Sequence, residues 1–287
     1  MGRREVLKMF LASGCVAASG GIAAREAPRR DGALVRFAVF NDIHERPEII
    51  ERIAGHLRGR LDFTALNGDM VEDVRDLDSV VRCIVDPMKK LAERFGAPCH
   101  FVRGNREWRG AERDRLGELM AFRGAVFYRG FTLNGVRFVL LDTFEEAKGK
   151  YEPFTAMMSA ENEWLRAEVA SPAWRNAVQR IAIMHISPPF EPYPGKPTRW
   201  TCTAPGLKEM DDILDRSGVS FVCGAHLHTR RITGATDYRR YPIAVGGGPE
   251  WKSDVATCVS VYGDGIGVRQ VDKNGVVVES AYFSENS

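Results

Sequence analysis

Acidic, amide and imidazole side chains follow five short apolar runs of this sequence, and such side chains are common ligands of divalent metals. The five polar clusters are Asn41-Asp42-Ile43-His44, Asn67-Gly68-Asp69, Gly104-Asn105-Arg106-Glu107, His185 and Gly224-Ala225-His226-Leu227-His228. Together they offer two aspartates, one asparagine and four histidines as candidate ligands. That set is about what two metal ions need when one carboxylate bridges them, so the pattern predicts a site for two metal ions.

Buried strands must position these clusters. Ligands of an open α/β sheet lie beyond the carboxyl ends of its strands, so five strands ending at the clusters would bring the side chains to one edge. Alternation within Asp42-x-His44 and His226-x-His228 adds a second expectation. Residues two apart face the same side of an extended chain, so each pair is expected to point at one centre.

The first half of the chain reads as alternating strands and helices. Short apolar runs at 34–40, 61–66 and 99–102 predict strands, and 47–58 and 77–95 have helical periodicity. This alternation indicates an α/β layer with a largely parallel sheet. Helices are expected at 112–122, 160–170 and 206–216, and further strands at 125–128, 136–142, 180–185, 219–223 and 243–245. Turns at Asn134-Gly135, Asp264-Gly265 and Asn274-Gly275 predict hairpins.

In this order the clusters resemble the motifs of the calcineurin-like metallophosphoesterases, from about Asn41 to His228. That family has Asp-x-His, Gly-Asp, Gly-Asn-His-Asp/Glu, a lone His and Gly-His-x-His; here Ala225 stands where its last motif begins with Gly. The resemblance implies an α/β fold, a four-layer αββα sandwich of two mixed β-sheets flanked by helices. We expect one such domain over residues 31–287.

The resemblance also implies roles for individual residues. Asp42, His44 and His228 would bind one metal, Asn105, His185 and His226 the other, and Asp69 both. The ions would be divalent or of mixed valence, and the ligand types suit Mn, Fe or Zn without choosing among them. Glu72 stands where purple acid phosphatases have a metal-binding tyrosine, so an iron-tyrosinate centre is not expected.

The implied reaction is the hydrolysis of a phosphodiester, pyrophosphate or phosphomonoester bond in a small phosphorylated substrate, by in-line attack of a metal-bound hydroxide. Asp42, Asn105 and Arg106 are the expected catalytic residues. Arg106 replaces the histidine of the family motif. An arginine side chain keeps its proton at any working pH, so it is a poor general acid, but its guanidinium can bind two phosphate oxygens. Arginine here therefore favours anhydrides or activated diesters, and hydrolases of UDP-diacylglucosamine carry a similar Gly-Asn-Arg-Asp.

Two alternatives to this reaction stay open. One is a non-catalytic scaffold or binding protein of the same fold, and the other is a nuclease. Outside the first 26 residues the chain has equal numbers of basic and acidic residues, so charge gives no argument for a nucleic-acid partner. Arg103 and Arg109 either contact phosphate or are solvated.

The remaining features are interpreted more simply. His56, His100 and Asp142 are expected to be structural. The Gly246-Gly247-Gly248 run is either a plain turn or an anion-binding loop. The proline-rich segment 187–205 is either a wall of the substrate site or an ordered surface loop.

Residues 1–30 read as an export signal and short linker. Arg3-Arg4 ahead of an apolar stretch resembles a twin-arginine signal, which implies a periplasmic or extracellular protein with no membrane span in the mature chain. A disordered basic arm and lipid anchoring at Cys15 are the alternatives.

The six cysteines form no CxxC pair, so they predict neither a zinc site nor a disulfide framework, although one or two bridges stay possible. The oligomeric state stays open.

Overall fold

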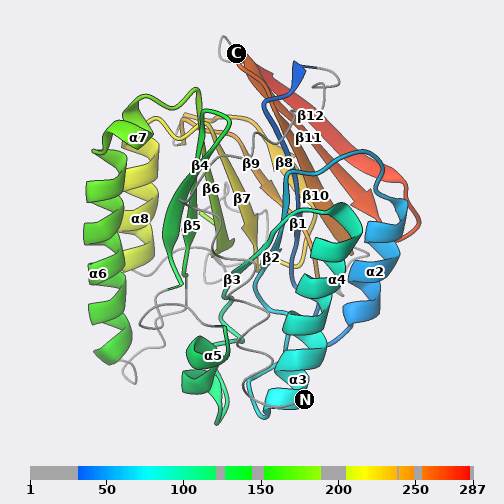
Figure 1. Cartoon of the computed structure of the whole chain (residues 1–287). Coiled ribbons are helices and arrows are strands. Elements are labelled where there is room, and N and C mark those ends of the chain that lie inside the picture. The colour runs from blue at the N-terminus through cyan, green and yellow to red at the C-terminus, as the bar shows by residue number, and fades with distance from the viewer. Residues whose placement is uncertain are drawn as a thin grey trace, which may run out of the picture.

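The computed structural model describes residues 32–120, 127–143, 152–188, 205–237, 239–248 and 254–284. The expected export signal, Cys15, Cys202 and most of the proline-rich segment lie outside these ranges. Two six-stranded sheets pack face to face, with helices on both outer sides (Figure 1). The predicted four-layer αββα sandwich is confirmed.

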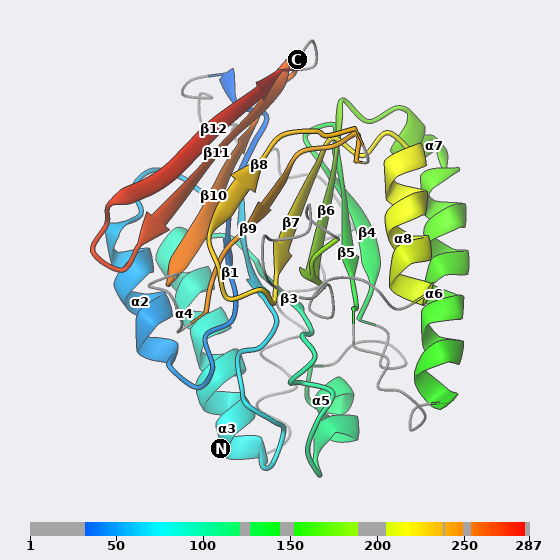
Figure 2. The same cartoon turned by 180° about the vertical axis from the view of Figure 1, so that it is seen from behind.

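The first sheet has the strand order β12-β11-β10-β1-β2-β3. Its strands are β1 (Val35–Phe40), β2 (Phe63–Asn67), β3 (Cys99–Val102), β10 (Val255–Val261), β11 (Gly265–Asp272) and β12 (Val277–Ser284). Strands β1, β2 and β3 are parallel, whereas β10, β11 and β12 form an antiparallel meander beside β1 (Figure 2). The three parallel strands therefore end at one edge, where the first three polar clusters follow them.

The second sheet has the order β4-β5-β6-β7-β9-β8. Its strands are β4 (Arg129–Leu133), β5 (Val136–Leu141), β6 (Gln179–Ile186), β7 (Phe221–Ala225), β9 (Ile243–Val245) and β8 (Arg231–Thr233). Strands β5, β6, β7 and β9 are parallel, and β4 and β8 are antiparallel edges. Of the last two polar clusters, His185 lies near the end of β6, and His226 and His228 directly follow β7, the two central strands of this sheet.

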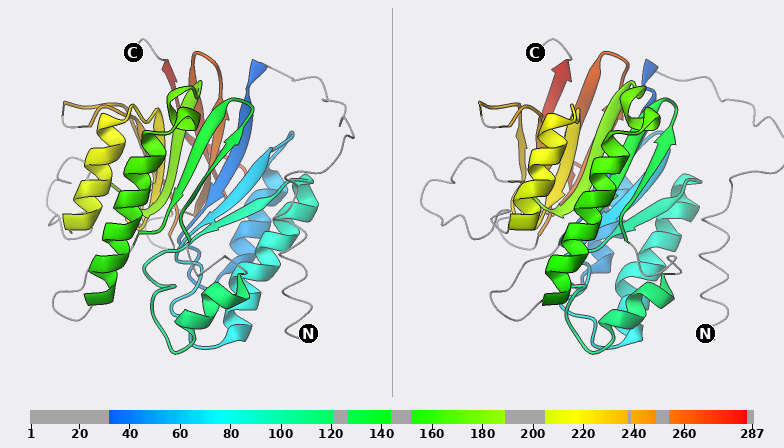
Figure 3. Two further views of the ribbon diagram at one scale, coloured as in Figure 1. Left: turned by 60° about the vertical axis from the view of Figure 1, so that its left-hand side comes forward. Right: turned by 90° about the vertical axis from the view of Figure 1, so that its left-hand side faces the viewer.

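Helices cover the outer face of each sheet (Figures 1 and 3). On one side lie α2 (Pro47–His56), α3 (Leu77–Val80), the π-helical turn η2 (Val81–Val85) and α4 (Asp86–Phe95); α6 (Glu152–Val169), α7 (Pro172–Arg175) and α8 (Pro205–Arg216) lie on the other. The short α5 (Arg113–Leu119) follows β3 and the third polar cluster. Within the described part of the chain, no helix is long and apolar enough to cross a membrane.

The core between the sheets explains why the strand sequences are apolar on both faces. Phe37 of β1 stacks on Phe63 of β2 with ring centroids 4.7 Å apart, and Phe138 of β5 meets both rings edge-on from the opposite sheet. All three side chains are fully buried, and burying each contributes roughly 1.5–3 kcal/mol. Two further apolar clusters lie under the outer helices. The strands thus form a rigid base for the polar loops that follow them.

Most of the predicted elements are present, with shifted ends. The first half of the strand expected at 125–128 lies outside the described residues, and residues 127 and 128 are not in a strand, since β4 begins at Arg129. Asn134 and Gly135 both have left-handed φ angles, 49° and 81°, as a two-residue hairpin turn requires. Leu133 pairs with Val136 across this turn, so the turn fixes where the partner strand lies. Of the cysteines within the described ranges, all are free: Cys83, Cys99, Cys223 and Cys258.

Candidate metal centre

The loops after β1, β2, β3 and β7, together with the end of β6, bring the candidate ligands together between the carboxyl ends of the two sheets. Two groups could hold metal ions, Asp42 with His44, Asp69 and His228, and Asp69 with His185 and His226. Within each group the ligand atoms all lie within 4.8 Å of one another. Asp69 belongs to both groups, as expected of a bridging carboxylate.

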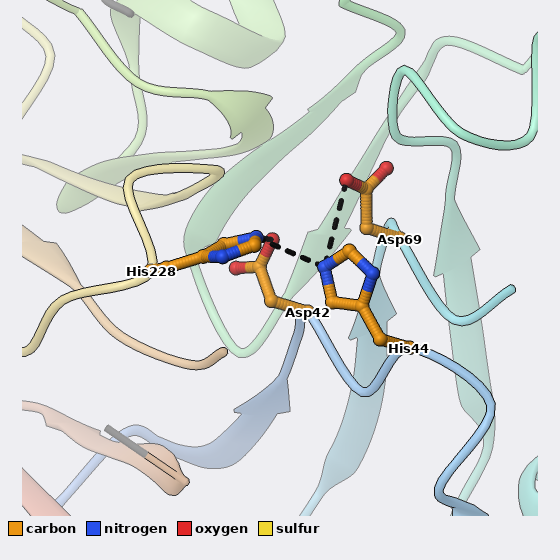
Figure 4. Close-up of side chains that lie close together, drawn as sticks. All are labelled: Asp42, His44, Asp69 and His228. Atoms are coloured by element: carbon orange, nitrogen blue, oxygen red, sulfur yellow. Dashed lines mark hydrogen bonds and ion pairs between the residues drawn. The ribbon is translucent and has the colours of Figure 1, made fainter. Parts of the chain in front are cut away.

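The first group is compact (Figure 4). The Nε2 atoms of His44 and His228 are 2.9 Å apart. His228 Nε2 lies 3.6 Å from Asp42 Oδ1, and His44 Nε2 lies 4.0 Å from Asp69 Oδ2. Nitrogen and oxygen donors from three different strand ends therefore point at one small volume.

The second group shares Asp69 with the first and lies close to Asp42. His185 Nε2 lies 3.3 Å from Asp69 Oδ1 and 3.9 Å from Asp42 Oδ1. The His185 and His226 rings are 5.4 Å apart, measured between centroids. Asn105 is buried on the same loop as Arg106, whose backbone N–H donates to Asp69 Oδ1 over 2.8 Å.

Several donor atoms at this site are buried without a hydrogen-bond partner, and this fits a metal. They are Asp42 Oδ1, Asn105 Oδ1 and His185 Nε2. Leaving a polar atom in that state costs about 1–3 kcal/mol each, a cost that a bound cation removes. Mixed carboxylate, amide and imidazole donors suit first-row divalent ions. The chemistry of the donor set and the orphaned atoms therefore both fit metal binding.

Hydrogen bonds orient two of the imidazoles for this task. His185 Nδ1 donates to the carbonyl oxygen of Asn67 over 2.8 Å, and His44 Nδ1 lies 2.8 Å from Glu72 Oε1. Because neither oxygen can donate, each Nδ1 carries a hydrogen, and Nε2 is the nitrogen that faces the site and could bind a metal ion. This is how metal-binding histidines are usually held.

The electrostatic field of the site is strongly negative. Burial lowers the pKa of His185, but the carboxylates of Asp69 and Asp42 outweigh it and raise that pKa to about 10. Burial also acts to raise the pKa of Asp69; His185, His226 and the Arg106 N–H outweigh it and hold that pKa well below its usual value. A field that retains a proton on a buried imidazole also attracts a divalent cation.

The backbone at the ligands is strained. Asp42, His44, Asp69, His226 and His228 all have positive φ angles, of 52°, 48°, 54°, 71° and 49°. Non-glycine residues rarely adopt this region, and such conformations cluster at functional sites because they cost of order 1–3 kcal/mol each. The extended backbone expected at the two i, i+2 pairs is therefore wrong. Asp42 and His44 still belong to one group, as expected, whereas His226 and His228 belong to different groups.

Glu107 ties the loops after β2 and β3 together, a role that its place in the sequence motif did not reveal. Its buried carboxylate accepts hydrogen bonds from the backbone N–H groups of Asp69 (2.9 Å), Met70 (2.8 Å) and Gly104 (2.7 Å). Burial raises the pKa of Glu107, while these hydrogen bonds act in the opposite direction. Asp69, the candidate bridging ligand, is thus held by a second carboxylate.

Asp42 is fixed in a similar way. Its Oδ2 accepts from Asn41 Nδ2 (2.8 Å) and from the backbone N–H of His226 (3.0 Å), so Oδ1 is left facing the site. The glycine run also contributes by packing. A Cβ atom on Gly247 would lie 2.1 Å from Asn41 Nδ2, and one on Gly248 would lie 2.7 Å from His228 Cβ. These glycines allow close packing behind two site residues.

The arginines of the third loop have different surroundings. Arg103 is buried, pairs with Asp142, and lies with its guanidinium carbon 3.7 Å from the Trp108 ring centroid and 3.5 Å from that of Phe127. Arg103 is therefore not solvated, and its guanidinium is already paired with Asp142, which has the structural role predicted for it. Arg109 is exposed.

The two histidines outside the motif have no place in the site. His56 is exposed at the end of α2. His100 lies in β3, where its Nδ1 is 2.7 Å from Arg129 Nη2; burial first, and then the Arg129 charge, lower the pKa of His100 to about 3. His100 therefore has the structural role predicted for it, and His56 lies outside both candidate metal groups.

Arg106 is partly exposed, with 31% of its side chain accessible. Its Nη1 lies 2.9 Å from Glu72 Oε2, and its Nε lies 3.8 Å from Asp69 Oδ2. The structure therefore brings Arg106 beside the candidate bridging ligand. Glu72 contacts both Arg106 and His44. The sequence at Glu72 argues only against an iron-tyrosinate centre and does not predict these contacts.

Solved structures with the same fold include several phosphatases. The chain is similar to a dimetal phosphatase from Danio rerio (14% identity, TM-score 0.66), covering 88% of this chain and 99% of that one. It is also similar to the purple acid phosphatase PPD1 from yellow lupin, Lupinus luteus (11% identity, TM-score 0.59), covering 87% of this chain and 53% of that one. A third similar structure is that of PhoD (10% identity, TM-score 0.57), with 87% of this chain and 68% of that one covered. At these identities the likeness bears on the fold alone. A search of curated proteins found no match.

A family model gives the more specific result. The model of the calcineurin-like phosphoesterases matches residues 35–230, a span that contains every candidate ligand. It begins at β1 and ends just after His228. This chain belongs to the calcineurin-like phosphoesterase family.

Proposed function

We propose that this protein is a dinuclear-metal-dependent hydrolase of phosphoric esters or anhydrides. The observation that carries the proposal is the convergence of six Asp and His side chains into two groups that share Asp69, with buried donor atoms left without hydrogen-bond partners. Family membership supports the same activity class. No observation favours nuclease activity.

The protein's own residues would prepare the site before substrate arrives. When bound, two divalent ions supply Lewis acidity and lower the pKa of a bound water. Asp42, His44 and His228 would hold one ion, Asn105, His185 and His226 the other, and Asp69 would bind both. Strained turns and the buried Glu107 keep these donors in place, so little reorganisation is needed during the reaction.

Arg106 supports a narrower proposal about the substrate. It lies beside Asp69 with part of its guanidinium accessible, so it can contact an oxygen of a bound phosphoryl group. It retains its proton at neutral pH, so it gives little help to a leaving alkoxide. A phosphate or pyrophosphate leaving group needs little protonation. We therefore favour pyrophosphates and activated diesters over alkyl monoesters.

The test combines metal content with hydrolysis of bis-p-nitrophenyl phosphate in the presence of Mn²⁺, Fe²⁺ or Zn²⁺. We expect His226→Gln to lose bound metal and to lower hydrolysis by at least about 100-fold, because even residues that only hydrogen-bond to a ligand are worth 10–100-fold. His56→Gln is the matched control, since it makes the same change at an exposed helix end. Equal activity in the two variants would reject the proposal, and a metal-bound but inactive wild type would favour the non-catalytic alternative.

A further inference from the structure

Glu72 occupies an unusual position between a candidate metal ligand and a candidate substrate-binding cation. It follows the bridging Asp69 by three residues, and 37% of its side chain is exposed. Its two carboxylate oxygens are divided between two partners. Oε1 lies 2.8 Å from His44 Nδ1, and Oε2 lies 2.9 Å from Arg106 Nη1.

The contact with His44 is suited to orienting a ligand. His44 belongs to the first group, and its Nε2 lies 2.9 Å from His228 Nε2. A carboxylate on Nδ1 fixes the tautomer and ring orientation of an imidazole and makes the other nitrogen a better donor. This contact requires only a hydrogen-bond acceptor at the position of Oε1. The oxygen of a neutral amide could also supply it.

The contact with Arg106 is suited to holding a mobile side chain. A free arginine side chain loses about 2 kcal/mol of rotamer entropy when it is fixed. The ion pair between Nη1 and Glu72 and the proximity of Nε to Asp69 hold the guanidinium in place before a substrate binds. A guanidinium has five N–H donors, so donors remain for a second anion. Unlike the contact with His44, this one depends on the negative charge of Glu72.

We propose that Glu72 is a positioning residue with two separable tasks: it orients His44 for metal binding, and it holds Arg106 for contact with the phosphoryl group. The second task rests on the proposed function. The geometry makes Arg106 dependent on the charge of Glu72 and His44 dependent only on an acceptor at the same position. The two tasks can therefore be separated by substitution.

The experiment measures two affinities by calorimetry, that of the metal-free protein for Zn²⁺ and that of the zinc-loaded protein for inorganic phosphate. Glu72→Gln should leave zinc affinity within about threefold of wild type and weaken phosphate binding about tenfold, because its amide turns N–H groups toward Arg106. Glu72→Ala should also lower zinc affinity by about 10–100-fold. Arg106→Gln should weaken phosphate binding and leave zinc affinity unchanged. The double variant Arg106→Gln/Glu72→Gln should bind phosphate no more weakly than Arg106→Gln, because both substitutions remove the same contact.

Glu209→Gln is the matched control. Glu209 of α8 also divides its carboxylate between an arginine, Arg166, and a second polar partner, Asn162, at similar exposure but on the outer helices. It should change neither affinity. Unchanged or tighter phosphate binding in Glu72→Gln would overturn the role toward Arg106, and unchanged zinc affinity in Glu72→Ala would overturn the role toward His44. If no ester or anhydride is hydrolysed but both affinities shift as expected, the proposed function fails and the positioning role stands.

Discussion

Two arginines only three positions apart serve different purposes, and only their surroundings separate them. Arg103 is enclosed by Trp108 and Phe127 and neutralised by Asp142. Arg106 keeps an accessible guanidinium beside Asp69. The sequence placed both beside a phosphate site without distinguishing them. Burial and ion pairing, which depend on segments far away in the chain, decide which one can meet a substrate.

The role of Arg106 leads to a prediction about leaving groups. Arg106→His would restore a residue that can donate a proton near neutral pH. We expect kcat/KM for alkyl phosphomonoesters to rise relative to that for pyrophosphates, by up to the order of 10², the lower range of general acid catalysis. The measurement compares both substrate types in wild type and variant.

Arg109→His serves as the control for this comparison, because it makes the same change at an exposed position of the same loop. It should leave the ratio of the two substrate classes unchanged. A ratio that is also unchanged, or reversed, in Arg106→His would show that Arg106 does not set the preference for the leaving group.

At the scale of elements, much of the site could be predicted because each cluster ends a strand. Apolar runs with polar ends placed β1, β2, β3, β6 and β7 correctly to within about three residues. The left-handed turns at the ligands could not be foreseen, because Asp and His favour other conformations when alone. Tertiary contacts such as the Glu107 hydrogen bonds stabilise those turns. The role of Glu72 could not be predicted either, because its two partners, His44 and Arg106, lie on different loops and meet it only in the folded protein.

The loop after β2 gives a prediction at this scale. A Cβ atom on Gly68 would lie 2.5 Å from Gly104 Cα and 2.6 Å from His185 Nδ1, and Gly68 has a φ of 77°. Gly68→Ala should therefore force the β2 and β3 loops apart, destabilise the protein by about 1–3 kcal/mol beyond the cost of its backbone strain, and weaken zinc binding. Urea denaturation and zinc titration measure the two effects.

Gly59→Ala separates close packing from backbone strain. Gly59 has a similar φ of 85°, but a Cβ atom there meets no atom within 4 Å. Its substitution should cost only the strain of a left-handed alanine, roughly 1–2 kcal/mol, and leave zinc binding intact. If Gly68→Ala behaved in the same way, the close approach of the two loops would not matter for the site.

At the scale of the whole molecule, one buried polar network crosses three of the four layers. Glu161 of α6 accepts a hydrogen bond from the backbone N–H of Asp142 after β5 (2.8 Å), and Asp142 pairs with Arg103 after β3, in the other sheet. No sequence pattern predicted this link, since its members are 19 and 39 positions apart. It joins the two sheets beside the loop that carries Asn105.

Glu161 makes the stability of this assembly depend on pH. Burial and the neighbouring Asp142 raise the pKa of Glu161 well above its usual value. The folded protein then binds this proton more tightly than the unfolded chain. The resulting stabilisation is fully present below the unfolded pKa of about 4.3 and is lost as pH rises through the folded pKa. Glu161→Gln should therefore be more stable than wild type at neutral and alkaline pH, by about 1 kcal/mol or more, and the two should converge near pH 4.

Denaturant unfolding over a pH series measures this difference. Glutamine keeps an acceptor for the Asp142 N–H but has no proton to release, so its stability curve should lack the decline with rising pH that Glu161 causes. Glu163→Gln, at an exposed position of the same helix, controls for the loss of one surface charge and should follow wild type. If Glu161→Gln also followed wild type at every pH, the hydrogen bonds and charges around Glu161 would fully offset the cost of burying its carboxylate, and the pKa of Glu161 would not be raised.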